Sequence, residues 1–105
     1  MWIDRCAVSD PAKLAALPAA LDGGEKEVIA LADERHAELV IMDEAAGRRE
    51  LSRRGLAFLG TVGVLMLAKQ RQLLAALKPE LDQLRACGFH LSDRVYRACL
   101  AAVDE

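Results

Sequence analysis

The sequence has few aromatic residues, few cysteines and no long apolar run, and each shortage excludes a class of protein. Phe, Trp and Tyr make up 4% of the 105 residues, so Leu, Ala and Val must build most of the core. The three cysteines, Cys6, Cys87 and Cys99, have no CxxC spacing, and we interpret them as reduced residues of a cytoplasmic protein. The longest apolar stretch, residues 56–68, contains glycines and is shorter than the roughly 20 residues of a membrane-spanning helix. No membrane partner is expected.

An excess of basic residues is also missing. The net charge is −2 and the isoelectric point is about 5.7, which argues against a protein that permanently coats nucleic acid. A local basic patch remains compatible with these values. Hydrophobic residues make up 53% and charged residues 29%, a balance typical of a globular chain. The length suits one small domain, which we assign to residues 1–105.

Apolar runs and helical patterns alternate along the first part of the chain. Three runs predict short strands, at residues 2–8, 38–42 and 56–59. Helical patterns cover residues 21–37, 44–54, 62–75, 78–88 and 92–103, and one helical turn is expected before Pro18. Alternation of this kind predicts an α/β fold with a small three-stranded parallel sheet flanked by helices and a helical C-terminal third.

Capping residues support several of these helix boundaries. Asp22 is a good N-cap, and Glu25 follows at the spacing of a capping box. Gly55 is a natural glycine at the end of a helix. Thr61 and Ser92 are predicted to cap the helices that follow them.

Two adjacent carboxylates end the second predicted strand, in the stretch "LVIMDEAAGRRE" at residues 39–50. Ligands of parallel sheets gather at the carboxyl ends of strands, and Mg²⁺ prefers oxygen ligands. Asp43 and Glu44 are therefore candidate metal ligands. Two simpler interpretations stay open, because Asp43 could cap the following helix and Glu44 would be favourable in its first turn.

Glu25 is a third candidate acid. It shares a helix face with Val28, Ile29 and Ala32, which places its carboxylate at the edge of the expected buried face. The alternative is a purely structural role in a capping box with Asp22.

A basic cluster follows the paired acids and contains four arginines, Arg48, Arg49, Arg53 and Arg54. These side chains could hold RNA phosphates next to a metal site. They could equally form a solvated helix face in which the positive charges complement the helix dipole.

Three blocks of the sequence resemble the PIN domain, in particular a prokaryotic branch related to VapC-type toxins. They are "LDGGEKEVIALA", "ELVIMDEAAGRRE" with "GLAFLGTVGVLMLAK", and "LDQLRACGFHLSD". The resemblance implies a cytoplasmic α/β protein related to Mg²⁺- or Mn²⁺-dependent ribonucleases. It implies catalytic and metal-binding roles for Glu25 and Asp43, and Glu44 as a further metal ligand. Within the basic cluster, Arg48, Arg49 and Arg53 are the residues that we expect to contact RNA.

The chain departs from the family at its start. The family's opening strand carries a first acid in a stretch like "DTSPLI", which has no counterpart here. We therefore expect a partial PIN-like domain without the N-terminal third, or a start codon that lies upstream. Weak metal binding and little cleavage are expected of this chain alone.

Two classes of function stay open. The first is a ribonuclease of the toxin type, held by an antitoxin protein, and the second is a non-catalytic oligomerisation or binding module. A homodimer is expected of this chain, because unpaired strand edges favour pairing with another chain. Its contacts would come from residues 2–8 and from the last helix, through Val95, Tyr96, Cys99 and Leu100.

Overall fold

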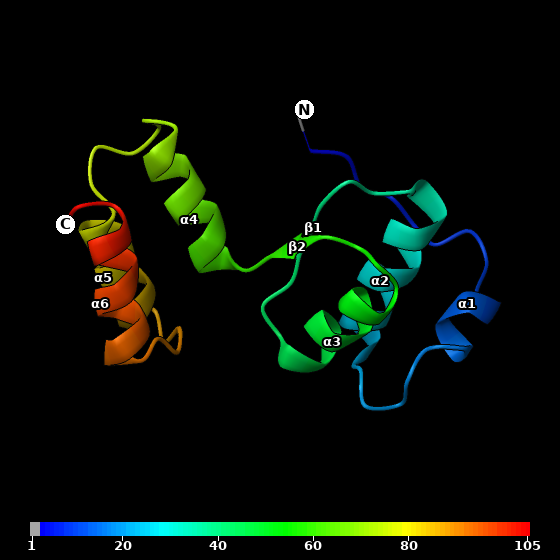
Figure 1. Ribbon diagram of the computed structural model, residues 1–105. Coiled ribbons are helices and arrows are strands. Elements are labelled where there is room, and N and C mark those ends of the chain that lie inside the picture. The colour runs from blue at the N-terminus through cyan, green and yellow to red at the C-terminus, as the bar shows by residue number, and fades with distance from the viewer. Residues whose placement is uncertain (1–2) are drawn as a thin grey trace. The chain divides into compact units, whose positions relative to one another are not determined.

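The computed structural model describes residues 3–105, which contain six helices and two short strands (Figure 1). Their order is α1 (Ala12–Ala15), α2 (Gly23–Arg35), β1 (Val40–Ile41), α3 (Ala45–Arg53), β2 (Phe58–Leu59), α4 (Thr61–Gln70), α5 (Lys78–Ala86) and α6 (Asp93–Ala102). The chain forms two compact units, Met1–Leu59 and Gly60–Glu105. The predicted α/β class is confirmed.

The sheet belongs to the N-terminal unit and has two parallel strands. Val40 is paired with Phe58 and Ile41 with Leu59, and α3 makes the crossover between the strands. The predicted strands at 38–42 and 56–59 therefore exist, but each is shorter than its apolar run.

The prediction of a third strand at residues 2–8 is wrong for its described part, since residues 3–8 form neither strand nor helix. Trp2 lies outside the described residues. The chain just after this segment is held by a side chain instead of a sheet partner. The backbone N–H groups of Ser9 and Asp10 donate to the carboxylate of Glu34 on α2, at 3.0 to 3.1 Å.

Helix α2 is the central element of the N-terminal unit. It begins as predicted, because Asp22 Oδ1 accepts a hydrogen bond from the Glu25 N–H at 2.8 Å. It ends at His36, whose backbone is left-handed with φ 52°. The core is formed by eight buried residues: Leu17, Leu21, Ile29, Ala30, Ala32, Val40, Met42 and Leu51. Val28, predicted to be buried, is instead 40% exposed.

Helix α3 follows β1 directly and packs against α2. It ends as predicted at Gly55, which has φ 72°, and the Leu56 N–H donates to the Leu51 carbonyl at 2.9 Å to close the turn. Helix α4 begins one residue earlier than predicted, with Gly60 and not Thr61 at the N-cap. It ends at Gln70, five residues short of the prediction, because Gln72 adopts a left-handed backbone with φ 62°.

The C-terminal unit is helical, as predicted. Its buried residues are Leu77, Leu81, Cys99 and Leu100. Pro79 lies in the first turn of α5, and Ser92 caps α6 by accepting from the Val95 N–H at 3.2 Å. Cys99 and Leu100 therefore pack inside their own unit, which removes them from the dimer surface expected of the last helix.

Candidate functional site

Asp43 and Glu44 lie at the carboxyl end of β1, where the chain turns into α3. The N-cap of α3 is Glu44, and its side chain makes no capping hydrogen bond. The interpretation of Asp43 as the N-cap is therefore wrong. The side chain of Asp43 lies 3.8 Å from Nη2 of Arg48. Both acids are exposed, so neither is held in a dry pocket.

Glu25 is half-buried in the first turn of α2. Its Oε2 atom is buried and has no hydrogen-bond partner among the described residues. Burial raises the pKa of the Glu25 carboxyl, and the charge of Asp22, a side-chain hydrogen bond with Asp22 and the charge of Glu44 raise this pKa further. The charge of Glu44 thus acts on Glu25, and the fold brings two of the three predicted acids into electrostatic contact.

An orphaned, buried carboxylate oxygen is the kind of atom that a hard cation could satisfy. However, no three His, Cys, Asp or Glu side chains within residues 3–105 come close enough together to hold a metal ion. The donor chemistry of Glu25 and Glu44 suits Mg²⁺ or Mn²⁺, but the number of donors does not. The described residues therefore do not fit a complete metal site of the kind that the resemblance implies.

Arg48 is occupied by local contacts at the end of β1. Its Nε donates to the Met42 carbonyl at 2.8 Å, and its guanidinium lies 5.8 Å from the ring centre of Phe58. Together with the ion pair to Asp43, these contacts join the two strands to α3. Arg48 thus has a structural role that the sequence pattern did not suggest.

Arg53 and Arg54 converge on Glu50, which is only 5% exposed. Arg53 Nη2 lies 2.5 Å and Arg54 Nε 2.9 Å from Glu50 Oε1. The two arginines lower the pKa of Glu50 from 4.5 to about 2. Arg54 also bonds to Asp33 at 3.3 Å, which ties α3 to α2. The buried Glu50 carboxylate is thus satisfied by Arg53 and Arg54, and this group of three residues has a structural role.

Arg49 differs from its neighbours. It is exposed, and no ion pair or hydrogen bond of its side chain occurs within the described part of the chain. It borders a hollow of about 160 Å³ together with Pro18, Ala20, Leu21, Ala46, Glu50 and Arg53. Of the three arginines predicted to contact RNA, Arg49 is the one whose guanidinium remains available.

Comparison with known proteins gives one match. A family model described as a PIN domain matches residues 1–105. No curated protein and no solved structure matches the chain. Within residues 3–105, none of the helices combines the length and the apolar character that crossing a bilayer requires. The match extends over the whole sequence and agrees with the α/β order of the elements. The chain therefore belongs to the PIN-domain family.

Proposed function

We propose that this chain is a nucleic-acid-related PIN module whose acids derive from a Mg²⁺- or Mn²⁺-dependent ribonuclease site, and that it cleaves RNA little or not at all by itself. In this proposal Glu25 and Asp43 are the retained catalytic acids. With Glu44 they hold a divalent ion weakly, since Mg²⁺ gives up its water shell reluctantly.

The observation that carries this proposal is the state of Glu25. Its orphaned Oε2 and its raised pKa are features of a carboxylate placed for a ligand and not for a salt bridge. Asp43 is held near Arg48 and is exposed, so the two catalytic candidates have different surroundings. A site with few ligands supports loose metal binding and slow or absent cleavage.

RNA contact is proposed to depend mainly on Arg49, with Arg53 as its neighbour on α3. A phosphate at this face would meet the free guanidinium of Arg49 at the border of the hollow. Arg48 and Arg53 would contribute less, because each already binds a carboxylate.

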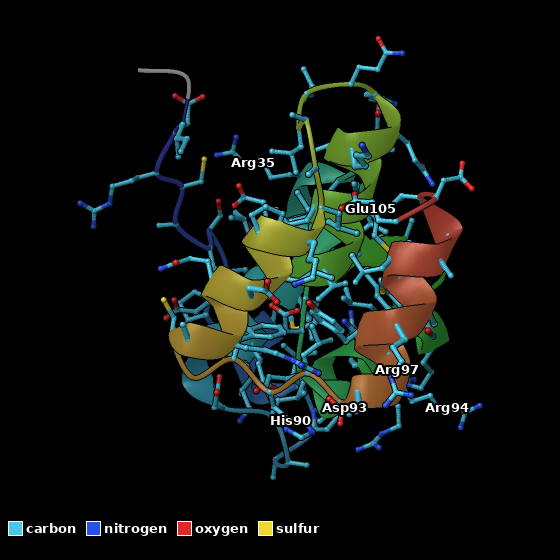
Figure 2. All side chains as sticks on the ribbon, turned by 90° about the vertical axis from the view of Figure 1, so that its left-hand side faces the viewer. Arg35, His90, Asp93, Arg94, Arg97 and Glu105 are labelled. Atoms are coloured by element: carbon cyan, nitrogen blue, oxygen red, sulfur yellow. The ribbon has the colours of Figure 1, made fainter. Side chains whose placement is uncertain are left out.

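RNA binding tests this side of the proposal. The anisotropy of a labelled single-stranded RNA pool is measured at low salt for the wild type and for Arg49→Ala. The matched control removes one charge elsewhere, in Arg94→Ala or Arg97→Ala on α6, two exposed residues (Figure 2). We expect binding to weaken in Arg49→Ala alone. Equal weakening in all three variants would indicate a nonspecific charge effect and would contradict the proposal.

A second candidate is a non-catalytic oligomerisation module, with a homodimer or an antitoxin protein as the partner. It is favoured by exposed apolar side chains, since Ile3 is 53% and Val95 is 45% exposed. Light scattering after size exclusion separates the candidates. A mass of 11.4 kDa, that of one chain, would exclude the homodimer.

A further inference from the structure

A cation of the protein itself lies next to one of the predicted metal-binding acids. At the carboxyl end of β1, Arg48 Nη2 is 3.8 Å from Oδ1 of Asp43. The two side chains are 42% and 36% exposed, so water shields the pair only in part. This distance is too long for a hydrogen bond but lies within the range of an ion pair. Electrostatic attraction therefore connects the two groups.

Arg48 is also held by contacts that do not involve Asp43. Its Nε donates to the Met42 carbonyl at 2.8 Å, and its guanidinium lies over the ring of Phe58 on β2, 5.8 Å from the ring centre. A cation at this distance is attracted to the face of an aromatic ring. Met42 is buried in the core of the N-terminal unit, and Phe58 packs against the same core. The position of the guanidinium thus does not depend on Asp43.

A divalent ion bound to Asp43 would lie close to this guanidinium. Mg²⁺ and its oxygen ligands are about 2.1 Å apart, so an ion on Oδ1 would lie within about 6 Å of Arg48 Nη2 in any direction. Salt at 0.1 M screens charges over roughly 10 Å, which leaves a repulsion at this separation. The repulsion is twice that between two unit charges, because the ion carries two. The charge of Arg48 therefore lowers the affinity of Asp43 for a divalent ion.

The mismatch between the predicted acids and a complete metal site thus has two causes. The donors are too few, since no three His, Cys, Asp or Glu side chains come close enough together among the described residues. In addition, Arg48 already balances part of the charge of Asp43. The neighbouring pair on α3, Arg53 and Arg54, binds a different carboxylate, that of Glu50.

We infer that Arg48 is a built-in counter-ion of Asp43 that opposes the binding of a divalent ion at this site. The inference deepens the proposed function and rests on it, because it concerns the same acids. Removal of the Arg48 charge should tighten metal binding, whereas loss of a purely structural contact should loosen it or leave it unchanged. The direction of the change therefore separates the two roles.

Mn²⁺ binding by the full chain tests the inference, followed through the paramagnetic resonance signal of the free ion. Arg48→Met removes the charge and keeps an unbranched side chain of similar helix propensity. We expect Arg48→Met to bind Mn²⁺ about fivefold more tightly than the wild type, the upper end of what exposed charge pairs contribute. Arg48→Lys restores the charge and should bring the affinity back towards that of the wild type. Arg48→Gln replaces Arg48→Met if the latter does not fold.

Two further variants locate the effect. Asp43→Asn in the Arg48→Met background should abolish the gain in affinity, because the acid on which Arg48 acts is gone. Arg35→Met is the matched control and should bind Mn²⁺ as the wild type does. Arg35 is exposed (Figure 2) and ends α2, about 15 Å along the helix from Glu25.

The possible outcomes distinguish this inference from the proposed function. Equal Mn²⁺ affinity of the wild type and Arg48→Met, with measurable binding by both, would overturn the inference and leave the proposed function intact. An equal gain in Arg35→Met would also overturn it, by indicating a general effect of charge. Absence of Mn²⁺ binding in every protein would overturn both, since no metal would then act at these acids.

Discussion

Gly47 on α3 lies directly against the side chain of Met42 at the end of β1. A Cβ atom added at Gly47 would lie 2.5 Å from Met42 Sδ and 2.9 Å from its Cγ and Cε. At these distances the buried Met42 side chain must move if Gly47 gains a Cβ, so glycine lets α3 lie this close to β1 without displacing Met42. The contact spans the turn between β1 and α3 that carries Asp43 and Glu44.

The first prediction is that Gly47→Ala destabilises the protein. Alanine would favour the helix by about 1 kcal/mol. Overpacking against the buried Met42 costs about 1–3 kcal/mol, and the clash should dominate because three atoms of one side chain are involved. The free energy of unfolding in urea measures the net change.

Two further variants make this result specific. A Cβ at Gly23, in the first turn of α2, would meet nothing within 4 Å, so Gly23→Ala should be close to neutral. In the background of Met42→Ala, the cost of Gly47→Ala should largely disappear. Additive effects of the two substitutions would show that the clash is not the cause.

The second prediction concerns Glu50 and acid stability. Its pKa is lowered from 4.5 in the unfolded chain to about 2 in the folded protein by Arg53 and Arg54. A lowered folded pKa means that the stabilisation is fully present above pH 4.5 and is lost as the pH falls toward 2. Glu50→Gln should reduce stability at neutral pH by about 2 kcal/mol and flatten the acid slope in this window.

The matched control for Glu50 is Glu38→Gln, which removes an exposed carboxylate from the same unit. Its urea midpoints between pH 2 and pH 7 should follow those of the wild type. If the urea midpoints of Glu50→Gln also followed those of the wild type, the ion pairs of Glu50 with Arg53 and Arg54 would contribute nothing measurable to stability.

The third prediction concerns the last residue. The Glu105 carboxylate accepts hydrogen bonds from the N–H groups of Leu77 and Lys78, at 2.6 and 3.1 Å, and lies 3.8 Å from Lys69 Nζ. These N–H bonds lower the pKa of Glu105. The side chain of Glu105, which is labelled in Figure 2, thus caps the start of α5.

Glu105→Gln should therefore speed hydrogen exchange at the Leu77 and Lys78 amides, since a neutral amide is a weaker acceptor than a carboxylate. Asp104→Asn is the control, because Asn tolerates the left-handed backbone at this position, where φ is 61°. If hydrogen exchange at the Leu77 amide were unchanged in Glu105→Gln, Glu105 would not act as a cap of α5.

Local signals in the sequence were sufficient to predict most of the helices, but they were not sufficient to predict how many strands the sheet has. Three helix boundaries were predictable because they depend on contacts between residues close in sequence. Asp22 and Ser92 accept hydrogen bonds from the first turns of their helices, and Gly55 adopts the left-handed backbone that ends α3. The strand at residues 2–8 was predicted from weak alternation, and alternation says nothing about whether a hydrogen-bonding partner exists. The following residues bind Glu34 instead, a contact 24 to 25 positions away along the chain.

In the candidate site, too, the sequence predicted local features and did not predict the contacts between distant residues. Spacing alone identified Glu25 as lying at the edge of a buried face, which agrees with its half-buried side chain. The cluster of arginines was read as one group, yet Arg48, Arg49 and Arg53 have different partners in space. A signal for Glu50 was present, since a carboxylate three and four residues before Arg53 and Arg54 is a standard helical ion-pair spacing. The close approach of Gly47 to Met42 depends on packing and leaves no pattern in the sequence.

RNA cleavage tests the central claim most directly. Purified protein is incubated with a mixed RNA pool and Mn²⁺, beside Glu25→Gln and a sample without metal. We predict that all three samples degrade RNA no faster than buffer, because the described acids do not complete a metal site. Robust Mn²⁺-dependent cleavage by the wild type that is lost in Glu25→Gln would contradict this account and identify the chain as an active ribonuclease.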